Sequence, residues 1–511
     1  MQVWLESAGV GLLFALLLLV ASLFKQRGYQ NNDQTNHEPK GCLQSPPLSA
    51  TLPGPPSLPL LGNMLELMQE HLPSHLTTLA RRYGNIYRLK FGNNTMVVLS
   101  GSDIIREALV KKWTDFAGRP HSFTGDIVSG GGCSISLGDY SDEWKLHRRL
   151  VHSALQRCTA ESLHSLIQQQ ALKLRKVLLE YNETAVDLSE DFTVAASNVI
   201  TTLAFGKQYN KTSPELQCLH GCLNEIVALW GSSWISALDS FPILRKLPNP
   251  PFSRLLKEVS RRDDIIRTYL KELKVEDDAI KERGALTAFL KKQEKTEGES
   301  QRSTLTDTHV HMTTVDLLIG GTETTAAWLS WTVAFLLHRP EIQHKVHEEM
   351  CSVLEARYPD YKDRHRLPHL SALISEVLRL RPVAPLAVPH RAIRNSSIAG
   401  YFIPKDTVII PNLFGAHHDP TVWRDPYSFK PERFLKADGA LLRSLLPFSG
   451  GARLCLGESV AKMEIFLFTA YLLRDFELLH PGDKECLPDL KGVASVVLKT
   501  KPFKVIVRPR A

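Results

Sequence analysis

The sequence predicts a mainly α-helical protein with small β-sheets, preceded by an N-terminal membrane anchor. Residues 102–224 follow helical spacing almost throughout, and two alternating apolar segments before them indicate short strands. The long apolar run at 312–337 contains Asp316 and Glu323, which cost several kcal/mol each in lipid. This run therefore predicts a helix of about 30 residues from His309, buried through the middle of a soluble domain.

The composition fits a large globular enzyme better than a nucleic-acid binder. The chain has 511 residues, of which 43% are hydrophobic and 23% charged, so it can bury a large core. Its formal charge of +7 is spread along the chain without a dense Lys/Arg tract, so we expect no nucleic-acid partner. The eight cysteines show neither a CxxC nor a zinc-ligand spacing, which favours a reducing compartment.

The N-terminus carries an uncharged segment at 7–24, followed by Lys25 and Arg27. Its length is about the minimum that spans a bilayer, and the cations favour a cytosolic position for the chain that follows. A cleaved signal peptide is the alternative, but no small-residue cleavage site follows closely. We therefore expect a transmembrane anchor at 1–24 that holds the protein on membrane lipid.

The residues after the anchor predict a tether, a hinge and one large domain. Residues 25–50 are polar and aperiodic, which indicates a flexible tether. The prolines of 52–59 fix φ and remove backbone donors, so this hinge should be stiff and extended. We therefore divide the chain into the anchor, a tether and hinge at 25–59, and a folded domain at 60–511.

Shorter signals mark the surface of that domain. The strand segments lie at 86–89 and 96–99. A second proline cluster at 241–251 interrupts the helical pattern and predicts a loop lid, and residues 283–308 are charged and rich in Ser and Thr.

The chemistry-bearing segment is 448–457, which reads Phe-Ser-Gly-Gly-Ala-Arg-Leu-Cys-Leu-Gly. A cysteine thiolate such as that of Cys455 is a strong donor to haem iron and promotes cleavage of the O–O bond of dioxygen. The glycines let the backbone pass close under a porphyrin, and Arg453 can meet a propionate carboxylate. A glycine-rich turn with a buried cysteine is the alternative for a lone Cys, but the ten-residue pattern favours a haem ligand.

This segment resembles the haem-binding loop of the cytochrome P-450 superfamily, FxxGxRxCxG, and other family motifs occur in the expected order. Glu376 and Arg379 match its ExxR pair on one helical face, and 431–434 matches its PERF segment. Each pair alone could be a solvated salt bridge. The resemblance implies a buried charge cluster of Glu376, Arg379 and Arg433. It also implies the cytochrome P-450 fold, with the long central helix over the haem and Cys455 as axial ligand of the iron.

Residues 320–325, Gly-Gly-Thr-Glu-Thr-Thr, are similar to the oxygen-activation motif of that family. The resemblance implies that the glycines leave room for dioxygen and that Glu323 and Thr324 act as catalytic residues, relaying the two protons that monooxygenation needs. As an isolated pattern, the segment could be a polar kink in a helix.

Further contacts to haem b, iron protoporphyrin IX, follow from the resemblance. Trp144 and Arg148 match the family's WxxxR segment on a predicted helix, and His390 stands where a propionate partner is usual. With Arg453 and Cys455 these residues form the predicted cofactor site. Their alternative is an ordinary helix and strand surface.

Segments 310–340 and 368–416 resemble the vertebrate steroid 21-hydroxylases, a branch of the superfamily. This resemblance implies hydroxylation of carbon 21 of progesterone and 17-hydroxyprogesterone in corticosteroid biosynthesis. The reaction would use O2 and electrons from NADPH through NADPH–cytochrome P-450 reductase, with cytochrome b5 as an optional partner. It also implies a catalytic domain on the cytosolic face of the endoplasmic reticulum membrane.

The same resemblance assigns three substrate contacts. Arg262 would donate to the steroid 3-keto oxygen, Asp316 would line the pocket near the haem, and Trp230 would lie against the substrate. From the residues alone, Arg262 could equally be a solvated helix charge beside other charged residues. Ala384 departs from the pattern, since a larger branched residue is expected over the steroid.

Other functions remain open at this stage. A steroid 17-hydroxylase/lyase or a broad-substrate monooxygenase would carry the same loop. A haem-thiolate isomerase would not need the Glu323 and Thr324 pair, whose presence argues against it. A haem sensor is the non-enzymatic alternative, and it would not consume NADPH when steroid is added.

Overall fold

A computed structural model of the protein describes residues 51–59, 61–92, 94–158, 162–275, 305–482 and 486–510. The expected anchor at 1–24 and the tether up to residue 50 lie outside these residues. Within the described ranges no helix is long and apolar enough to cross a membrane.

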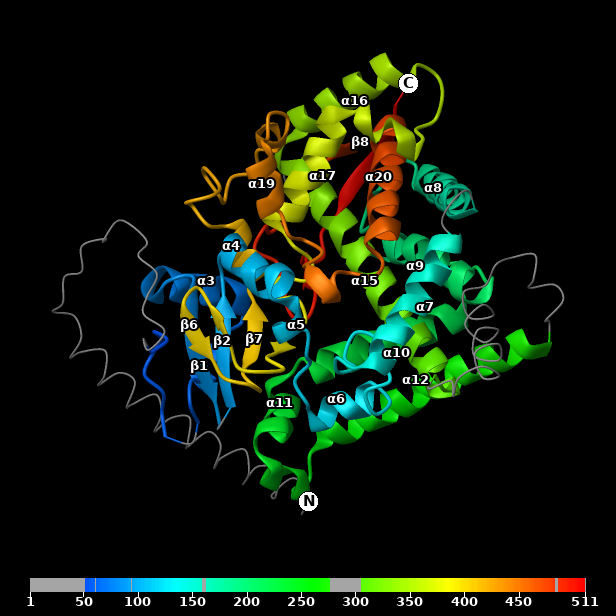
Figure 1. Ribbon diagram of the computed structural model, residues 1–511. Coiled ribbons are helices and arrows are strands. Elements are labelled where there is room, and N and C mark those ends of the chain that lie inside the picture. The colour runs from blue at the N-terminus through cyan, green and yellow to red at the C-terminus, as the bar shows by residue number, and fades with distance from the viewer. Residues whose placement is uncertain are drawn as a thin grey trace.

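The described chain is mainly helical, as predicted (Figure 1). The longer helices are α3 (Leu72–Tyr83), α7 (Asp142–Cys158), α8 (Ser162–Glu180), α9 (Ser189–Phe205), α10 (Pro214–Trp230), α12 (Pro250–Val275), α15 (Asp307–His338), α16 (Pro340–Leu354), α17 (Pro368–Leu380) and α20 (Glu458–Asp475). The short α-helices are α2 (Met64–Leu67), α4 (Ser102–Arg106), α5 (Trp113–Phe116), α6 (Phe123–Val128), α11 (Ser233–Ser240), α18 (Leu413–His417) and α19 (Gly439–Ser444). A π-helical turn η1 (Glu107–Lys111) and the 3₁₀ turns η2 (Pro242–Lys246), η3 (Tyr361–His365), η4 (Pro431–Phe434) and η5 (Gly451–Arg453) complete the helical part.

The strands form small sheets beside the helices. The largest sheet has the order β1-β2-β7-β4, with β1 (Ile86–Phe91), β2 (Asn94–Leu99), β7 (Val408–Pro411) and β4 (His390–Arg391). Its hairpin β1–β2 contains both segments predicted to be strands, and β2 runs parallel to β7. The others are β3 (Ala185–Val186), β11 (Val505–Pro509) and β8 (Phe476–Leu479) in one sheet, and the pairs β9 (Val493–Ala494) with β10 (Leu498–Lys499) and β5 (Ser396–Ile398) with β6 (Tyr401–Ile403).

The long helix α15 runs through the middle of the molecule (Figure 1). Its start is fixed by a capping box, in which Thr306 and His309 each accept a hydrogen bond from the other residue's backbone. It ends at His338, with Arg339 as its C-cap, because Pro340 begins the next helix and proline is tolerated at a first helical position. The expected long buried helix is thus confirmed, and it starts two residues before His309.

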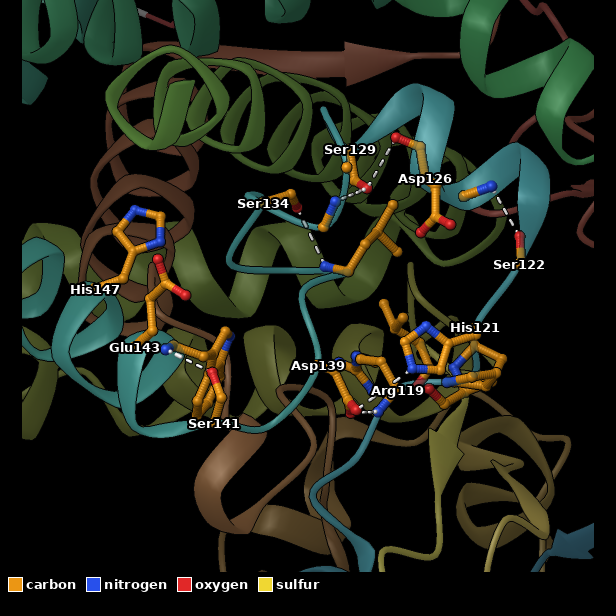
Figure 2. Close-up of a pocket in the computed structure, with 18 of the residues that line it drawn as sticks. Arg119, His121, Ser122, Asp126, Ser129, Ser134, Asp139, Ser141, Glu143 and His147 are labelled. Carbon is orange, nitrogen blue, oxygen red and sulfur yellow. Dashed lines mark hydrogen bonds and ion pairs between the residues drawn. The ribbon is translucent and has the colours of Figure 1, made fainter. Parts of the chain in front are cut away.

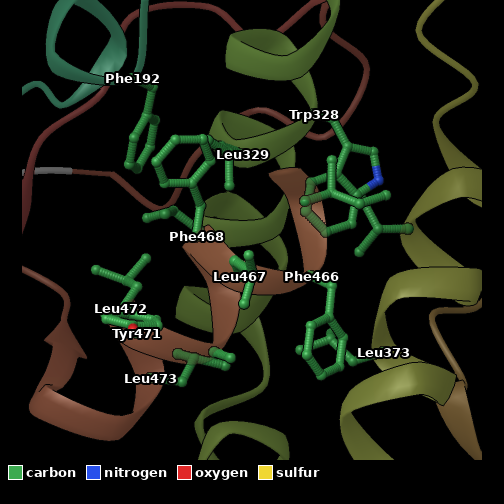
Figure 3. Close-up of a cluster of buried hydrophobic side chains, with 14 of the residues drawn as sticks. Phe192, Trp328, Leu329, Leu373, Phe466, Leu467, Phe468, Tyr471, Leu472 and Leu473 are labelled. Atoms are coloured by element: carbon green, nitrogen blue, oxygen red, sulfur yellow. The ribbon is translucent and has the colours of Figure 1, made fainter. Parts of the chain in front are cut away.

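The main core lies where α15 crosses α20 (Figure 3). Trp328 and Leu329 of α15 meet Phe466 and Phe468 of α20, with Phe192 of α9 alongside. These side chains are almost fully buried, and burying each stabilises the fold by roughly 1.5–3 kcal/mol. The core therefore fixes α20 against α15, the two helices that flank the candidate site.

The proline cluster at 241–251 differs from the predicted loop lid. Pro242 starts the short turn η2, and Pro250 is the first residue of α12. Proline fits both positions because the first backbone N–H groups of a helical turn have no partner within the helix. The cluster is thus a junction between helices, and only residues 241 and 247–249 are irregular.

Candidate active site

A cavity of about 360 Å³ opens at Cys455 and is called here the Cys455 cavity. One wall is α15, and the opposite wall consists of residues 447–457 and the first turns of α20. Residues 383–390 and Arg119 close a third side. The predicted ligand and the predicted oxygen motif therefore share one cavity.

Local hydrogen bonds hold Cys455 at the floor of this cavity. Its backbone N–H donates to the carbonyl of Phe448 at 3.1 Å, and Arg148 donates to the carbonyl of Leu454. Gly451 has φ +68°, and a Cβ there would lie 1.6 Å from the carbonyl oxygen of Leu109. Only glycine fits this close approach. The thiol is open to the cavity, and burial raises its pKa, an effect that nearby Arg148 opposes.

Three arginines, Arg119, Arg148 and Arg453, lie together at the edge of the cavity. Burial lowers the pKa of Arg453 to about 8 and that of Arg119 to about 9, and repulsion among the three guanidinium groups adds to both shifts. Asp139 acts in the opposite direction, but it also forms an ion pair with Arg391. The edge is thus rich in buried, under-compensated positive charge.

This donor set fits a haem group. The two propionate carboxylates of haem would supply the missing negative charge, and charge-assisted bonds from arginine to carboxylate are among the strongest in proteins. The thiol of Cys455 is the soft ligand that haem iron accepts, and coordination to a metal deprotonates a thiol. Arg119, Arg148 and Arg453 would therefore hold the group, and Cys455 would bind its iron.

His390 and Trp144 occupy different places relative to this cluster. His390 lines the cavity, and its Nδ1 is 2.8 Å from the carbonyl oxygen of Phe116. Burial, followed by repulsion from Arg119, keeps its pKa well below the usual range. Trp144 does not line the cavity: its indole N–H donates to the Ile135 carbonyl at 2.9 Å. Its ring packs 3.8 Å from the guanidinium carbon of Arg453, so Trp144 supports that arginine.

Some residues of the oxygen motif on α15 line the cavity, and others contact neighbouring elements of the fold. Gly320 lines the cavity, and a Cβ there would meet nothing within 4 Å, so the missing side chain leaves open space. At Gly321 a Cβ would lie 2.4 Å from Ile200, so this glycine also serves the contact with α9. Thr324 lines the cavity and donates to the Gly320 carbonyl at 2.5 Å. Glu323 does not line it and forms an ion pair with Lys499.

Asp316 lines the cavity one turn before Gly320 and anchors the 134–136 segment to α15. Its carboxylate accepts hydrogen bonds from Ser136 Oγ at 2.6 Å, Ile135 N–H at 2.7 Å and Ser134 Oγ at 2.9 Å. Burial raises its pKa, and these hydrogen bonds oppose the shift. The carboxylate is thus engaged by protein donors and shapes the cavity wall.

A second cavity of about 410 Å³ adjoins the first at Arg119, which lines both (Figure 2). The close-up shows Arg119 beside Asp139 and His121, with His147 and Glu143 on another side of the space. Trp230, at the end of α10, lines this second cavity and not the first, and its indole N–H donates to Thr124 Oγ1 at 3.2 Å.

Thr313 and His147 link the two cavities. Thr313 lines the Cys455 cavity, and its hydroxyl donates to the carbonyl of His309 at 2.8 Å. His147 lines the second cavity, and its Nε2 is 2.7 Å from the same hydroxyl oxygen, so this nitrogen is the donor. Burial, followed by repulsion from His309, lowers the pKa of His147 to about 3, so the imidazole is neutral.

Arg262 is fully buried in α12 but lines neither cavity. Its Nε donates to Asp263 at 2.8 Å, and its Nη1 donates to the Val128 carbonyl at 2.9 Å. Asp263 also meets His311 of α15 at 2.9 Å. Arg262 is thus neither the solvated helix charge considered above nor part of the cavity wall, and Nη2 takes no part in these two hydrogen bonds.

The structure brings Glu376, Arg379 and Arg433 together beneath the core. Arg379 donates to both carboxylate oxygens of Glu376, at 2.7 and 2.9 Å, and Arg433 lies 3.0 Å from the same carboxylate. Arg379 also donates to the carbonyls of His417 and Pro426. The cluster therefore joins α17 to the segment that leads to Cys455.

Arg119 is the contributor to the cofactor site that sequence reasoning missed. It follows α5 in an irregular segment, and its guanidinium reaches the carbonyls of Ser136, Val388 and Pro389. A single arginine beside glycine and proline has no recognisable pattern. Its role depends on three segments that meet only in the folded chain.

Comparison with known proteins agrees with this geometry. The family model described as Cytochrome P450 matches residues 52–507 of the chain. The chain belongs to the cytochrome P450 family. It is therefore a haem-thiolate monooxygenase, and family membership implies haem iron.

The curated relatives include steroid 21-hydroxylases. The human protein is 43% identical over 459 residues, covering 88% of this chain and 92% of the human one. The pig protein is 43% identical over 88% of this chain and 92% of its own. Similar solved structures include a zebrafish cytochrome P450 with progesterone, at a TM-score of 0.75 and 34% identity, covering 86% of this chain and 99% of that one. Another holds abiraterone, at a TM-score of 0.75 and 35% identity, covering 87% and 99%.

Proposed function

We propose that this protein is a steroid 21-monooxygenase that hydroxylates carbon 21 of progesterone and 17-hydroxyprogesterone. The observation that carries the proposal is the 43% identity to the human steroid 21-hydroxylase over 88% of this chain. The structural likeness to a cytochrome P450 with progesterone supports the steroid class.

The chemistry of the Cys455 cavity supports a steroid substrate. Away from the arginine edge its lining is mostly apolar, with Leu, Ile, Val and Ala side chains from several elements. An apolar cavity with a small number of polar groups binds a rigid apolar skeleton and fixes its orientation. In this proposal Thr313 and Asp316 are polar groups of the α15 wall that face the steroid, beside Thr324 and Thr325.

Bound haem would supply dioxygen activation and electron acceptance at the iron. The chain's own residues would bind and orient the partners of that chemistry. Arg119, Arg148 and Arg453 would neutralise the propionates, and His390 would stand beside one of them as an uncharged partner. Gly320 leaves space on α15, and the Thr324 hydroxyl would pass protons into that space. Glu323, held by Lys499 outside the cavity, would feed protons to Thr324 from behind the helix.

The substrate contacts expected from the sequence remain part of the proposal. Trp230 would lie against a steroid on its way through the second cavity, and Asp316 would shape the inner wall. Arg262 would use Nη2, the nitrogen outside its two hydrogen bonds, to meet the 3-keto oxygen. Arg262→Leu should then weaken progesterone binding roughly tenfold to a hundredfold and leave a 3-deoxy steroid unaffected. Equal losses for both ligands would make Arg262 purely structural.

The proposal includes the membrane and the electron donor. Residues 1–24 would anchor the protein in the endoplasmic reticulum membrane, with the catalytic domain at 60–511 on the cytosolic face. NADPH–cytochrome P-450 reductase would deliver the electrons, and cytochrome b5 would be an additional partner.

One incubation tests the proposed reaction. Purified protein, reductase, NADPH and progesterone are combined, and the products are resolved by mass and retention time. A 21-hydroxylated product is expected. A 17-hydroxylated product would assign the chain to a different steroid hydroxylase, and a product set spread over many positions would indicate a broad-substrate enzyme.

A further inference from the structure

Glu464 is a buried acid of α20 that the chemistry above does not use. Its side chain is only 1% exposed and lines the Cys455 cavity. One carboxyl oxygen, Oε2, accepts a hydrogen bond from Thr325 of α15 at 2.8 Å. The other, Oε1, is buried without a hydrogen-bond partner among the described residues.

The surroundings of Glu464 offer no compensating charge. Helices α8, α15, α16 and α17 pack against α20, and among the described residues only burial and the Thr325 hydrogen bond, and no charged group, shift the pKa of Glu464. Phe466 and Leu467, two and three residues later in α20, point into the apolar core (Figure 3). Burial raises the pKa of Glu464 to about 8, against a smaller opposite effect of the Thr325 hydrogen bond. The carboxyl group is therefore neutral at pH 7.

We propose that Glu464 is a positioning residue for the monooxygenase reaction, whose buried carboxyl group ties the helix following Cys455 to the helix that carries the oxygen motif. Its partner Thr325 is the neighbour of Thr324 in the chain. The cavity lies between these two helices, so the hydrogen bond fixes their separation where the haem must fit. Small displacements of reacting groups cause large losses of rate. By holding the two helices in place, this hydrogen bond would raise the amount of product formed per NADPH.

The neutral form is essential to this role. An ionised Glu464 would be a buried charge with one hydrogen bond, and water or a displacement of α20 would be needed to stabilise it. Above pH 8 the hydrogen bond from Thr325 would itself strengthen, but the buried charge would draw in water or displace α20, so the packing of α20 on α15 should loosen. The proposal rests on the haem-thiolate chemistry of the site but not on the identity of the steroid, because haem retention can be measured without substrate.

The test compares holoenzyme variants at both ends of the hydrogen bond. Glu464→Leu and Thr325→Val each remove it, whereas Glu464→Gln and Thr325→Ser keep a hydrogen-bonding group of similar size. The control is Gln343→Leu, which removes the buried hydrogen bonds between Gln343 and Leu478, neither of which lines the Cys455 cavity. The measurements are the rate of haem transfer to an excess haem acceptor, the product formed per NADPH, and the 450 nm carbon-monoxide band from pH 6 to 9.

Losing one such bond should speed haem transfer roughly twofold to tenfold in Glu464→Leu and in Thr325→Val, with less product per NADPH. The double variant Glu464→Leu/Thr325→Val should lose haem no faster than either single variant, because all three lack the same hydrogen bond. Glu464→Gln and Thr325→Ser should retain haem nearly as well as the wild type. In the wild type the 450 nm band should decline above pH 8, and in Glu464→Gln it should not. Thr325→Val disturbs folding less than Glu464→Leu. If this variant transferred haem at the wild-type rate and formed as much product per NADPH, the proposal would be refuted. Haem loss in Gln343→Leu equal to that in Glu464→Leu would also refute it.

Discussion

Replacing Glu376 by alanine should lower the free energy of unfolding more than replacing any surface acid. Glu376 and Arg379 are both 0% exposed, and Arg433 and the backbone N–H of Lys430 share the same carboxylate. Glu376→Ala would leave two guanidinium groups facing each other without their common counter-ion. Breaking a buried pair by removing one partner costs about 3–5 kcal/mol, which is a large part of the stability of a typical protein.

The assay is a urea titration followed both by far-UV circular dichroism and by the 450 nm carbon-monoxide band. The matched control is Asp142→Asn, because Asp142 is 98% exposed and pairs with Lys145 at 2.8 Å on the surface. That change should lower the free energy of unfolding far less than Glu376→Ala does, because ion pairs between exposed side chains contribute little. If Glu376→Ala lost no more than this control, the cluster would not be a buried structural tie and the reasoning would be wrong.

Three further changes test the site. Cys455→His should abolish the 450 nm band, which thiolate ligation produces, and a variant that kept both the band and turnover would contradict the ligand assignment. Thr324→Ala should retain haem but release more peroxide per NADPH, because the hydroxyl no longer passes protons into the cavity; unchanged coupling would transfer that role to another group. Glu464→Gln should match the wild type near pH 4.5 and become more stable towards pH 8, by up to about 5 kcal/mol in urea titrations. The wild type loses stability over this range because its unfolded state releases the Glu464 proton while its folded state, with a pKa of about 8, retains it. A difference independent of pH would contradict the buried, neutral state.

The features that the sequence predicts well are local ones. Cys455, Arg453 and the glycines stand in one short segment whose residue types already describe a loop beneath a flat ligand. The ExxR pair lies on one helical turn, so its geometry follows from helix spacing. The long helix α15 is visible as an apolar run whose acids are incompatible with lipid.

The features that the sequence does not predict depend on how each helix is rotated about its axis when it packs in the fold. Trp144 and Trp230 supply their indole N–H groups to protein partners, and Arg262 turns to Asp263 and Val128. Periodicity places a residue on a helix, but tertiary packing decides which cavity its side chain reaches. The proposed role of Glu464 is also of this kind, because it depends on Thr325, which is more than a hundred residues away in the chain.

The most direct test of the central claim uses labelled dioxygen. Purified holoenzyme, reductase, NADPH and progesterone are incubated under ¹⁸O₂, and the steroid product is fragmented in a mass spectrometer. Monooxygenation at the Cys455 cavity predicts one labelled oxygen atom, located on carbon 21, and no such product from Cys455→His. A product whose added oxygen came from water, or a rearranged steroid with no added oxygen, would contradict the assignment.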